Sequence, residues 1–148
     1  MNATLKIVVP TDFSDGSVCA LDWVKKLGAG QSTEVHCVNV VHQPMMYMPM
    51  MSAVPPDAMP SIDQLKQMSQ ESLDIFVDKY FKKLSIEPVT KVLAGRPATE
   101  ITNYAKEIGA DIIVIATRGQ SMLAHALLGS TAEGVLRQAE CPVLSVRS

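Results

Sequence analysis

The sequence predicts an α/β protein built on one open parallel sheet with helices on both faces. Five short apolar runs alternate along the chain with segments of helical periodicity. Strands separated by helices in this way form parallel sheets through right-handed crossovers. The chain has 148 residues, of which 47% are hydrophobic, and shows no internal repeat. Length and composition therefore predict one domain over residues 1–148 with a substantial core.

The first part of the chain predicts two strands with a helix between them. Leu5–Val9 is a continuous apolar run, typical of a strand buried on both faces. Ser14 is a suitable N-cap for a helix that ends at Gly28 and Gly30. The apolar positions of this helix are Val18, Leu21, Trp23, Val24 and Leu27. The second strand is predicted at Val35–Val41.

A long irregular segment follows at residues 42–61. Its five prolines oppose regular structure, and loops of this length inside a compact domain are often functional or mobile. The thioethers of its methionines, together with His42, would suit Cu(I). Methionine also serves as adaptable apolar filler, and we favour a role for this segment as a flexible flap or a partner contact. The six methionines of the segment are Met45, Met46, Met48, Met50, Met51 and Met59.

The second part of the chain predicts three more helices and three more strands. A helix runs from near Ile62 to Leu84 with an apolar stripe that includes Met68, and a strand follows at Glu87–Leu93. Pro97 suits the first position of the next helix, and Gly109 suits its C-terminal stop. The fourth strand, the last helix and the fifth strand are predicted at Ile112–Ile115, Ser130–Gln138 and Pro142–Val146.

Charge and cysteine content exclude several classes of protein. The formal net charge of -2 argues against nucleic acid as the main partner, since binding the phosphate backbone requires a basic face. No apolar segment is long enough to span a bilayer, and the N-terminus carries no targeting signal, so we expect a cytoplasmic protein. Three widely spaced cysteines without a CxxC indicate neither a disulfide framework nor a zinc site.

The clearest candidate site is a glycine-punctuated loop between the fourth strand and the last helix. It opens with Ala116-Thr117-Arg118-Gly119 and, nine residues later, closes with Gly129-Ser130-Thr131. Unpaired amides and the helix dipole at a helix N-terminus attract anions, and glycines allow close backbone approach. The Ser130 hydroxyl would then donate to a phosphate oxygen. Alternatively, Ser130 to Glu133 form a capping box, which needs no ligand.

Thr11 and Asp12 directly follow the first strand, which can lie beside the fourth at the point where the winding of the sheet reverses. Ligands of open parallel sheets bind at that point. The Asp12 carboxylate would accept hydrogen bonds from an adenine or a ribose there. The alternative is that Asp12 only stabilises the turn between strand and helix.

No residue qualifies as catalytic from its spacing. His36, His42 and His125 have no serine or cysteine partner at a recognisable distance, and the motifs HExxH and GxSxG are missing. The phosphate-binding motif GxxxxGK[ST] is also missing, so fast phosphoryl transfer lacks its usual lysine. Arg96 and Arg118 would add positive charge near a triphosphate if they face it, or are simply solvated.

Several segments together resemble the universal stress protein family, and the resemblance runs the full length of the chain. It implies a sheet of order 3-2-1-4-5, like that of the adenine nucleotide alpha hydrolases, and a cytoplasmic stress-response protein. The segments that carry it are Ile7–Ser14, Gly95–Ala98, Gly109–Val114, Leu127–Ser130 and Cys141–Leu144.

The ATP-binding branch of that family carries the motif G-x2-G-x9-G-[ST]. Ala116 stands here in place of the first glycine, Gly119 and Gly129 match the other two, and Arg118 replaces a common histidine. The resemblance implies a site for ATP, with or without Mg²⁺, formed by Pro10, Thr11, Asp12, Val40, Ala116, Arg118, Gly119, Gly129, Ser130 and Thr131.

The resemblance also implies a homodimer that pairs through the exposed edge of Val143–Val146. We therefore expect a regulatory dimer that binds ATP at the ends of strands one and four and is not a conventional enzyme. Two alternatives stay open. Ala116 favours a nucleotide-free interaction module, and Asp12 with a bound metal would suit a slow ATP hydrolase.

Overall fold

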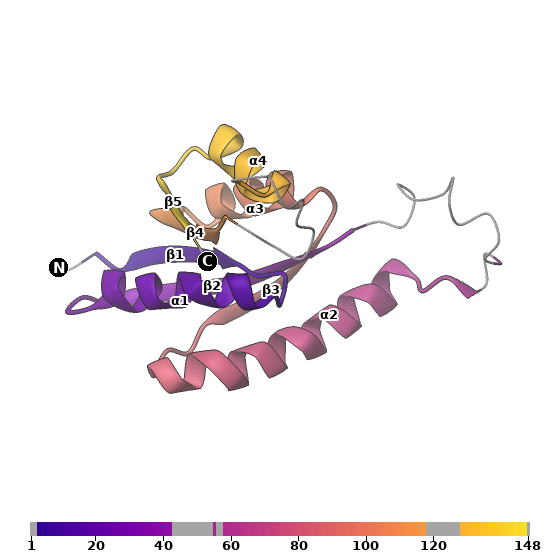
Figure 1. Ribbon diagram of the computed structural model, residues 1–148, viewed down its shortest axis with the longest axis horizontal. Helices are drawn as coiled ribbons and strands as arrows, with labels where there is room; N and C mark the ends of the chain where they lie inside the picture. Colours follow the sequence, from indigo (N-terminus) through magenta and orange to yellow (C-terminus); the bar gives the residue numbers. More distant parts are fainter. Residues whose placement is uncertain (1–2, 43–54, 56–57, 118–127, 148) are drawn as a thin grey trace.

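The computed structural model describes residues 3–42, 55, 58–117 and 128–147, and a five-stranded parallel sheet forms its centre (Figure 1). The strand order is β3-β2-β1-β4-β5, which confirms the predicted topology. The strands are β1 (Leu5–Pro10), β2 (Thr33–Val41), β3 (Val89–Ala94), β4 (Ile112–Ala116) and β5 (Val143–Val146). The α-helices are α1 (Asp15–Gly28), α2 (Ile62–Phe76), α3 (Pro97–Glu107) and α4 (Ser130–Gln138).

Helices cover both faces of the sheet, with α1 and α2 on one face and α3 and α4 on the other (Figure 1). The central strand β1 shows the consequence residue by residue. Ile7 and Val9 pack into the core with α1 and α2, whereas Val8 packs against α3 and α4. All three side chains are almost completely buried, as a continuous apolar run in a parallel sheet predicts.

Because the strands are parallel, the carboxyl ends of β1, β2 and β4 lie at the same end of the sheet. β1 pairs in parallel with β2 on one side and with β4 on the other. Beyond the end of β1, the amide of Thr11 still donates to the carbonyl of Val38 at 2.9 Å. Beyond the end of β4, the amide of Thr117 donates to the carbonyl of Val146 at 2.8 Å. The loops that follow β1 and β4 therefore begin side by side at the same edge.

The long predicted helix changes its winding after Phe76. A π-helical segment, η3 (Val77–Phe81), and a short 3-10 segment, η4 (Lys82–Leu84), continue it to Ser85. Phe76 and Phe81 are five residues apart, and both are buried. The wider π turn, with its i→i+5 bonding, keeps residues at this spacing on one face of the helix. The next strand begins at Val89, two residues later than predicted.

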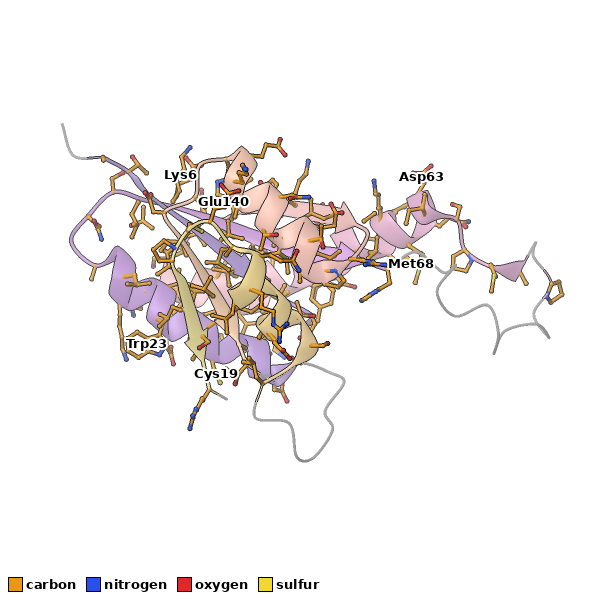
Figure 2. The ribbon with its side chains drawn as sticks, turned by 90° about the horizontal axis from the view of Figure 1, so that it is seen from above. Lys6, Cys19, Trp23, Asp63, Met68 and Glu140 are labelled. Carbon is orange, nitrogen blue, oxygen red and sulfur yellow. The ribbon has the colours of Figure 1, made fainter. Side chains whose placement is uncertain are left out.

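Two apolar residues expected in helix stripes are exposed instead. Trp23 lies on the outer side of α1 (Figure 2) and is 42% exposed. The ammonium of Lys26 lies 4.5 Å from the centre of its ring. Met68 of α2 is 60% exposed. Both positions were predicted from hydrophobicity alone, and neither lies on the face of its helix that meets the sheet.

Helix ends follow the sequence signals in most places. Pro97 opens α3, and Gly109 after it adopts a left-handed φ of 64°. Ser14 is the N-cap residue of α1, as predicted, but its side chain makes no capping bond and donates to the Asp12 carboxylate instead. Within the described ranges, no helix has the length and apolarity that crossing a membrane requires.

Candidate functional site

A cavity of about 770 Å³ opens beyond the carboxyl ends of β1, β2 and β4, between the N-terminal ends of α3 and α4. This is the edge at which open parallel sheets bind ligands, and the volume is in the usual range for small-molecule sites. Arg118 and Gly119 lie outside the described residues, as does His125. The other eight residues predicted for the nucleotide site all line the cavity: Pro10, Thr11, Asp12, Val40, Ala116, Gly129, Ser130 and Thr131.

The N-terminus of α4 forms one wall of the cavity. The first hydrogen bond within this helix runs from the amide of Glu133 to the carbonyl of Gly129, at 2.9 Å. The amide of Gly129 donates to the carbonyl of Thr117, so it is already engaged. The amides of residues 130–132 precede the first helical bond and have no partner within the helix. All three residues line the cavity, so this wall offers amide donors and the positive end of a helix dipole.

The capping-box interpretation of Ser130 is wrong, because Ser130 is not the N-cap residue of α4. The N-cap of α4 is Gly129, and no side-chain capping bond is present at this helix end. Glu133, which the box would use, pairs with Arg137 one turn later, at 2.7 Å. Ser130 is instead the first residue of the helix, and it faces the cavity.

Ala116, in place of the first motif glycine, is an ordinary strand residue. It is the last residue of β4 and pairs with Val146 of β5. Among the described non-glycine residues, a positive φ occurs at Phe13 and Ser85 and not at Ala116. Gly129 also has unremarkable angles, a φ of -68° and a ψ of 153°. Neither position therefore needs glycine for its backbone conformation.

The loop after β1 is held by short-range hydrogen bonds. The Thr11 hydroxyl is 2.9 Å from that of Ser17 and accepts the amide of Phe13 at 3.0 Å. Asp12 accepts the amide of Ser14 at 3.0 Å, so its carboxylate stabilises the turn, as one of the two interpretations predicts. Phe13 adopts a left-handed φ of 66°, a strained value for an aromatic residue. Because Asp12 also lines the cavity, both interpretations of this residue are compatible.

Several lining residues carry no motif signal. Thr99 comes from α3, Gly134 and Gln138 come from α4, and the hydroxyl of Thr99 is 3.2 Å from the side-chain oxygen of Gln138. These residues meet only because the two helices pack together. Asn39 also lines the cavity, and its one available signal is a polar side chain within a predicted buried strand.

The described residues that line the cavity include one carboxylate, Asp12, one permanent cation, Arg96, and one imidazole, His42. The buried His36 is not among them. Its Nε2 lies 2.6 Å from Glu34 and its Nδ1 lies 2.8 Å from the Tyr104 hydroxyl.

The hydrogen bond from His36 lowers the pKa of Glu34, and burial raises the pKa of Tyr104. Burial also raises the pKa of the Cys37 thiol to about 12, so this cysteine is not a nucleophile. His36 and Cys37 are thus parts of the core and not of the cavity.

Comparison with known proteins identifies the relatives of this chain. The model of the universal stress protein family matches residues 4–147. Universal stress protein MJ0531 of Methanocaldococcus jannaschii is 35% identical over 99% of this chain and 84% of its own length. Universal stress protein YxiE of Bacillus subtilis is 32% identical over 96% of this chain and 98% of its own length.

Solved structures share the fold. The structure of protein MJ0577 of Methanocaldococcus jannaschii matches with a TM-score of 0.78 and 25% identity, over 97% of this chain and 96% of that chain. A universal stress protein in complex with cAMP matches with a TM-score of 0.68 and 22% identity, over 96% of both chains. One from Archaeoglobus fulgidus in complex with dAMP matches with a TM-score of 0.67 and 21% identity, over 98% of both chains.

Proposed function

The chain belongs to the universal stress protein family, and on this premise we propose that it binds an adenine nucleotide, ATP with or without Mg²⁺, beyond the ends of β1 and β4. The observation that carries the proposal is the cavity of about 770 Å³. It brings together residues from both ends of the chain beyond the carboxyl ends of the strands, where open parallel sheets bind ligands. Two relatives of the same fold are described as complexes with cAMP and dAMP, which supports an adenine nucleotide as the ligand class.

Each part of the cavity suits a different part of a nucleotide. The amides of residues 130–132, with the hydroxyls of Ser130 and Thr131, would hold the phosphates, because they offer donors at the positive end of α4. Asp12 and Val40 would contact the adenosine. Arg96, exposed at the N-cap of α3, would add positive charge near the phosphates.

The lining side chains favour binding over catalysis. The described part of the cavity holds no lysine, and its carboxylate, Asp12, is assigned above to the adenosine and not to the phosphates. We therefore propose a regulatory role in which nucleotide changes how the protein meets its partners, and not a conventional enzyme.

We further propose that the protein acts as a homodimer paired through β5. This strand is the last in the sheet order, so its outer edge has no neighbouring strand in the described part of the chain. Ser145 of this strand is exposed, and unpaired strand edges are prone to pair with another copy.

We also propose that the protein works in a reducing cytoplasm, because Cys19, Cys37 and Cys141 are free.

Titration calorimetry with ATP, ADP, AMP and GTP tests the nucleotide proposal. We expect saturable heat with ATP, and binding about tenfold weaker for Ser130→Ala, because a hydrogen bond to a charged phosphate is lost. Ser72→Ala, on the exposed face of α2, is the matched control and should bind as the wild type does. Absence of heat at millimolar ATP, with no nucleotide released when fresh protein is denatured, would favour the nucleotide-free interaction module.

Light scattering coupled to size exclusion tests the dimer. We expect a wild-type mass of twice the 16.0 kDa chain, and a monomer for Ser145→Lys, since a charge on the strand edge opposes pairing. An unchanged mass for this variant would place the interface elsewhere.

A further inference from the structure

A short polar network connects the cavity to α2, which covers the face of the sheet away from α3 and α4. The side-chain amide of Asn39 donates to the carbonyl oxygen of Thr11 at 2.7 Å. The hydroxyl of Ser69 donates to the side-chain oxygen of Asn39, also at 2.7 Å. Asn39 and Thr11 line the cavity, whereas Ser69 belongs to α2. One side chain therefore touches both the loop after β1 and the helix.

The direction of both hydrogen bonds follows from the chemistry of the groups. A backbone carbonyl only accepts, so the NH₂ group of Asn39 must face Thr11. The oxygen of Asn39 then faces α2, where the Ser69 hydroxyl must donate. Reversing the amide would place two acceptors together at Thr11. The arrangement is thus fixed at both ends, and moving either partner requires the amide to move or to lose a bond.

Ser69 stands where α2 first meets the body of the protein. The buried residues of α2 are Ser69, Leu73 and Phe76, so the residues before Ser69 are not anchored in the core. Figure 1 shows the N-terminal end of α2 extending away from the sheet. Asp63 and Met68 lie on this projecting part (Figure 2). We call residues 62–68 the projecting segment of α2.

The anchoring of α2 changes character along its length. Leu73 and Phe76 belong to the apolar core, and Phe81 of η3 extends that contact. Nearer the projecting segment the attachment is polar, through Ser69 to Asn39 and through the amide of Gln70 to the hydroxyl of Thr90, at 3.2 Å. Segments held by few buried apolar contacts open locally at low cost. The projecting segment is therefore the part of α2 that a change at Asn39 would move.

We propose that Asn39 is a positioning residue through which a nucleotide in the cavity controls the projecting segment of α2. The inference rests on the proposed function for its ligand. A nucleotide that contacts the loop at Thr11 and Asp12 fixes the Thr11 carbonyl, which holds the Asn39 amide and, through it, Ser69. By reciprocity, a change on α2 alters nucleotide affinity, although Ser69 does not line the cavity.

Two variants separate the two arms of the network. Ser69→Ala removes the bond to α2 and leaves the bond to Thr11. Asn39→Asp keeps an acceptor for Ser69 but replaces the donor to Thr11 with an oxygen. Ser72→Ala, an exposed serine three residues after Ser69, is the matched control. Ser69→Thr keeps a hydroxyl at the same site and is the rescue variant.

The experiment combines ATP titration with hydrogen exchange read by mass spectrometry over residues 11–14 and 62–70. In the wild type, ATP should slow exchange in both segments. Ser69→Ala should bind ATP about fivefold more weakly and abolish the ATP-dependent protection of 62–70, while Ser69→Thr and Ser72→Ala behave as the wild type. The double variant with Asn39→Asp should lose less affinity than the two single losses combined, because both act through one side chain.

Failure of this inference is distinguishable from failure of the proposed function. If the wild type binds ATP but Ser69→Ala binds equally well and keeps the protection of 62–70, the coupling is overturned and the binding proposal stands. If the wild type binds no ATP, the proposed function fails together with control by nucleotide. In that case, faster exchange at 11–14 in ligand-free Ser69→Ala would still support the mechanical link, and unchanged exchange would overturn it.

Discussion

Replacing Gly134 with alanine tests how tightly α3 and α4 close one side of the cavity. A Cβ at position 134 would lie 2.5 Å from the Cβ of Ala98, and neither atom belongs to a flexible side chain. Carbon atoms in contact lie about 3.5–4.0 Å apart, so the two helices must separate by about 1 Å.

Overpacking of this kind costs about 1–3 kcal/mol, and the better helix propensity of alanine recovers up to about 1 kcal/mol. We expect a net loss of about 1–2 kcal/mol, which for 148 residues lowers Tm by about 3–6 °C. Because Ala98 and Gly134 both line the cavity, nucleotide affinity should fall as well.

The assay is urea unfolding of four proteins: the wild type, Gly134→Ala, Ala98→Gly and the double variant. Ala98→Gly removes the opposing Cβ, so the double variant should recover most of the stability that Gly134→Ala loses. The coupling between the two sites should be about 1–2 kcal/mol, as for residues in direct contact. A coupling near zero, or a Gly134→Ala variant more stable than the wild type, would refute the proposed packing.

Three further predictions concern a buried thiol, a carboxylate beside a buried histidine, and a helix end. Because burial raises the pKa of Cys37 to about 12, iodoacetamide should leave it unlabelled in the native protein and label it after unfolding, as read by peptide mass spectrometry. The fold lowers the pKa of Glu34 below its ordinary 4.5, so its contribution to stability is present above that pH and is lost as the pH falls. Glu34→Gln should therefore flatten the acid side of a plot of urea midpoint against pH. Ser61 and Gln64 form a complete capping box, and Ser61→Ala should cost about 1 kcal/mol in urea unfolding.

The sheet was predictable because its strands are recognisable from local composition. A parallel strand buried on both faces needs an unbroken apolar run, and Ile7 to Val9 meet that requirement. Pro97 and Gly109 mark the ends of α3 through their backbone preferences alone. Such signals depend on a few neighbouring residues, so they survive without any knowledge of the tertiary structure.

Other features depend on contacts that no local pattern records. The π segment after Phe76 is accompanied by the burial of two phenylalanines five residues apart, Phe76 and Phe81, in the same core. α4 begins at Ser130, as predicted, but its N-cap is Gly129, whose amide donates to the carbonyl of Thr117, so Ser130 is not the capping residue of a capping box. The close packing of Gly134 against Ala98 depends on how α3 and α4 meet, which neither helix sequence records alone.

The substitution at position 116 illustrates why a motif must be weighed by its place in the structure. The first glycine of the family motif falls at the end of β4, where pairing with Val146 fixes the backbone in an extended conformation. A side chain at such a position points to one face of the sheet and imposes no unusual φ. The alanine methyl group therefore alters only the wall of the cavity, and a volume of about 770 Å³ is present with that methyl group in place. Loss of this glycine is accordingly weak evidence for a nucleotide-free protein, and the amides of residues 130–132 carry more weight because they determine whether an anion can bind.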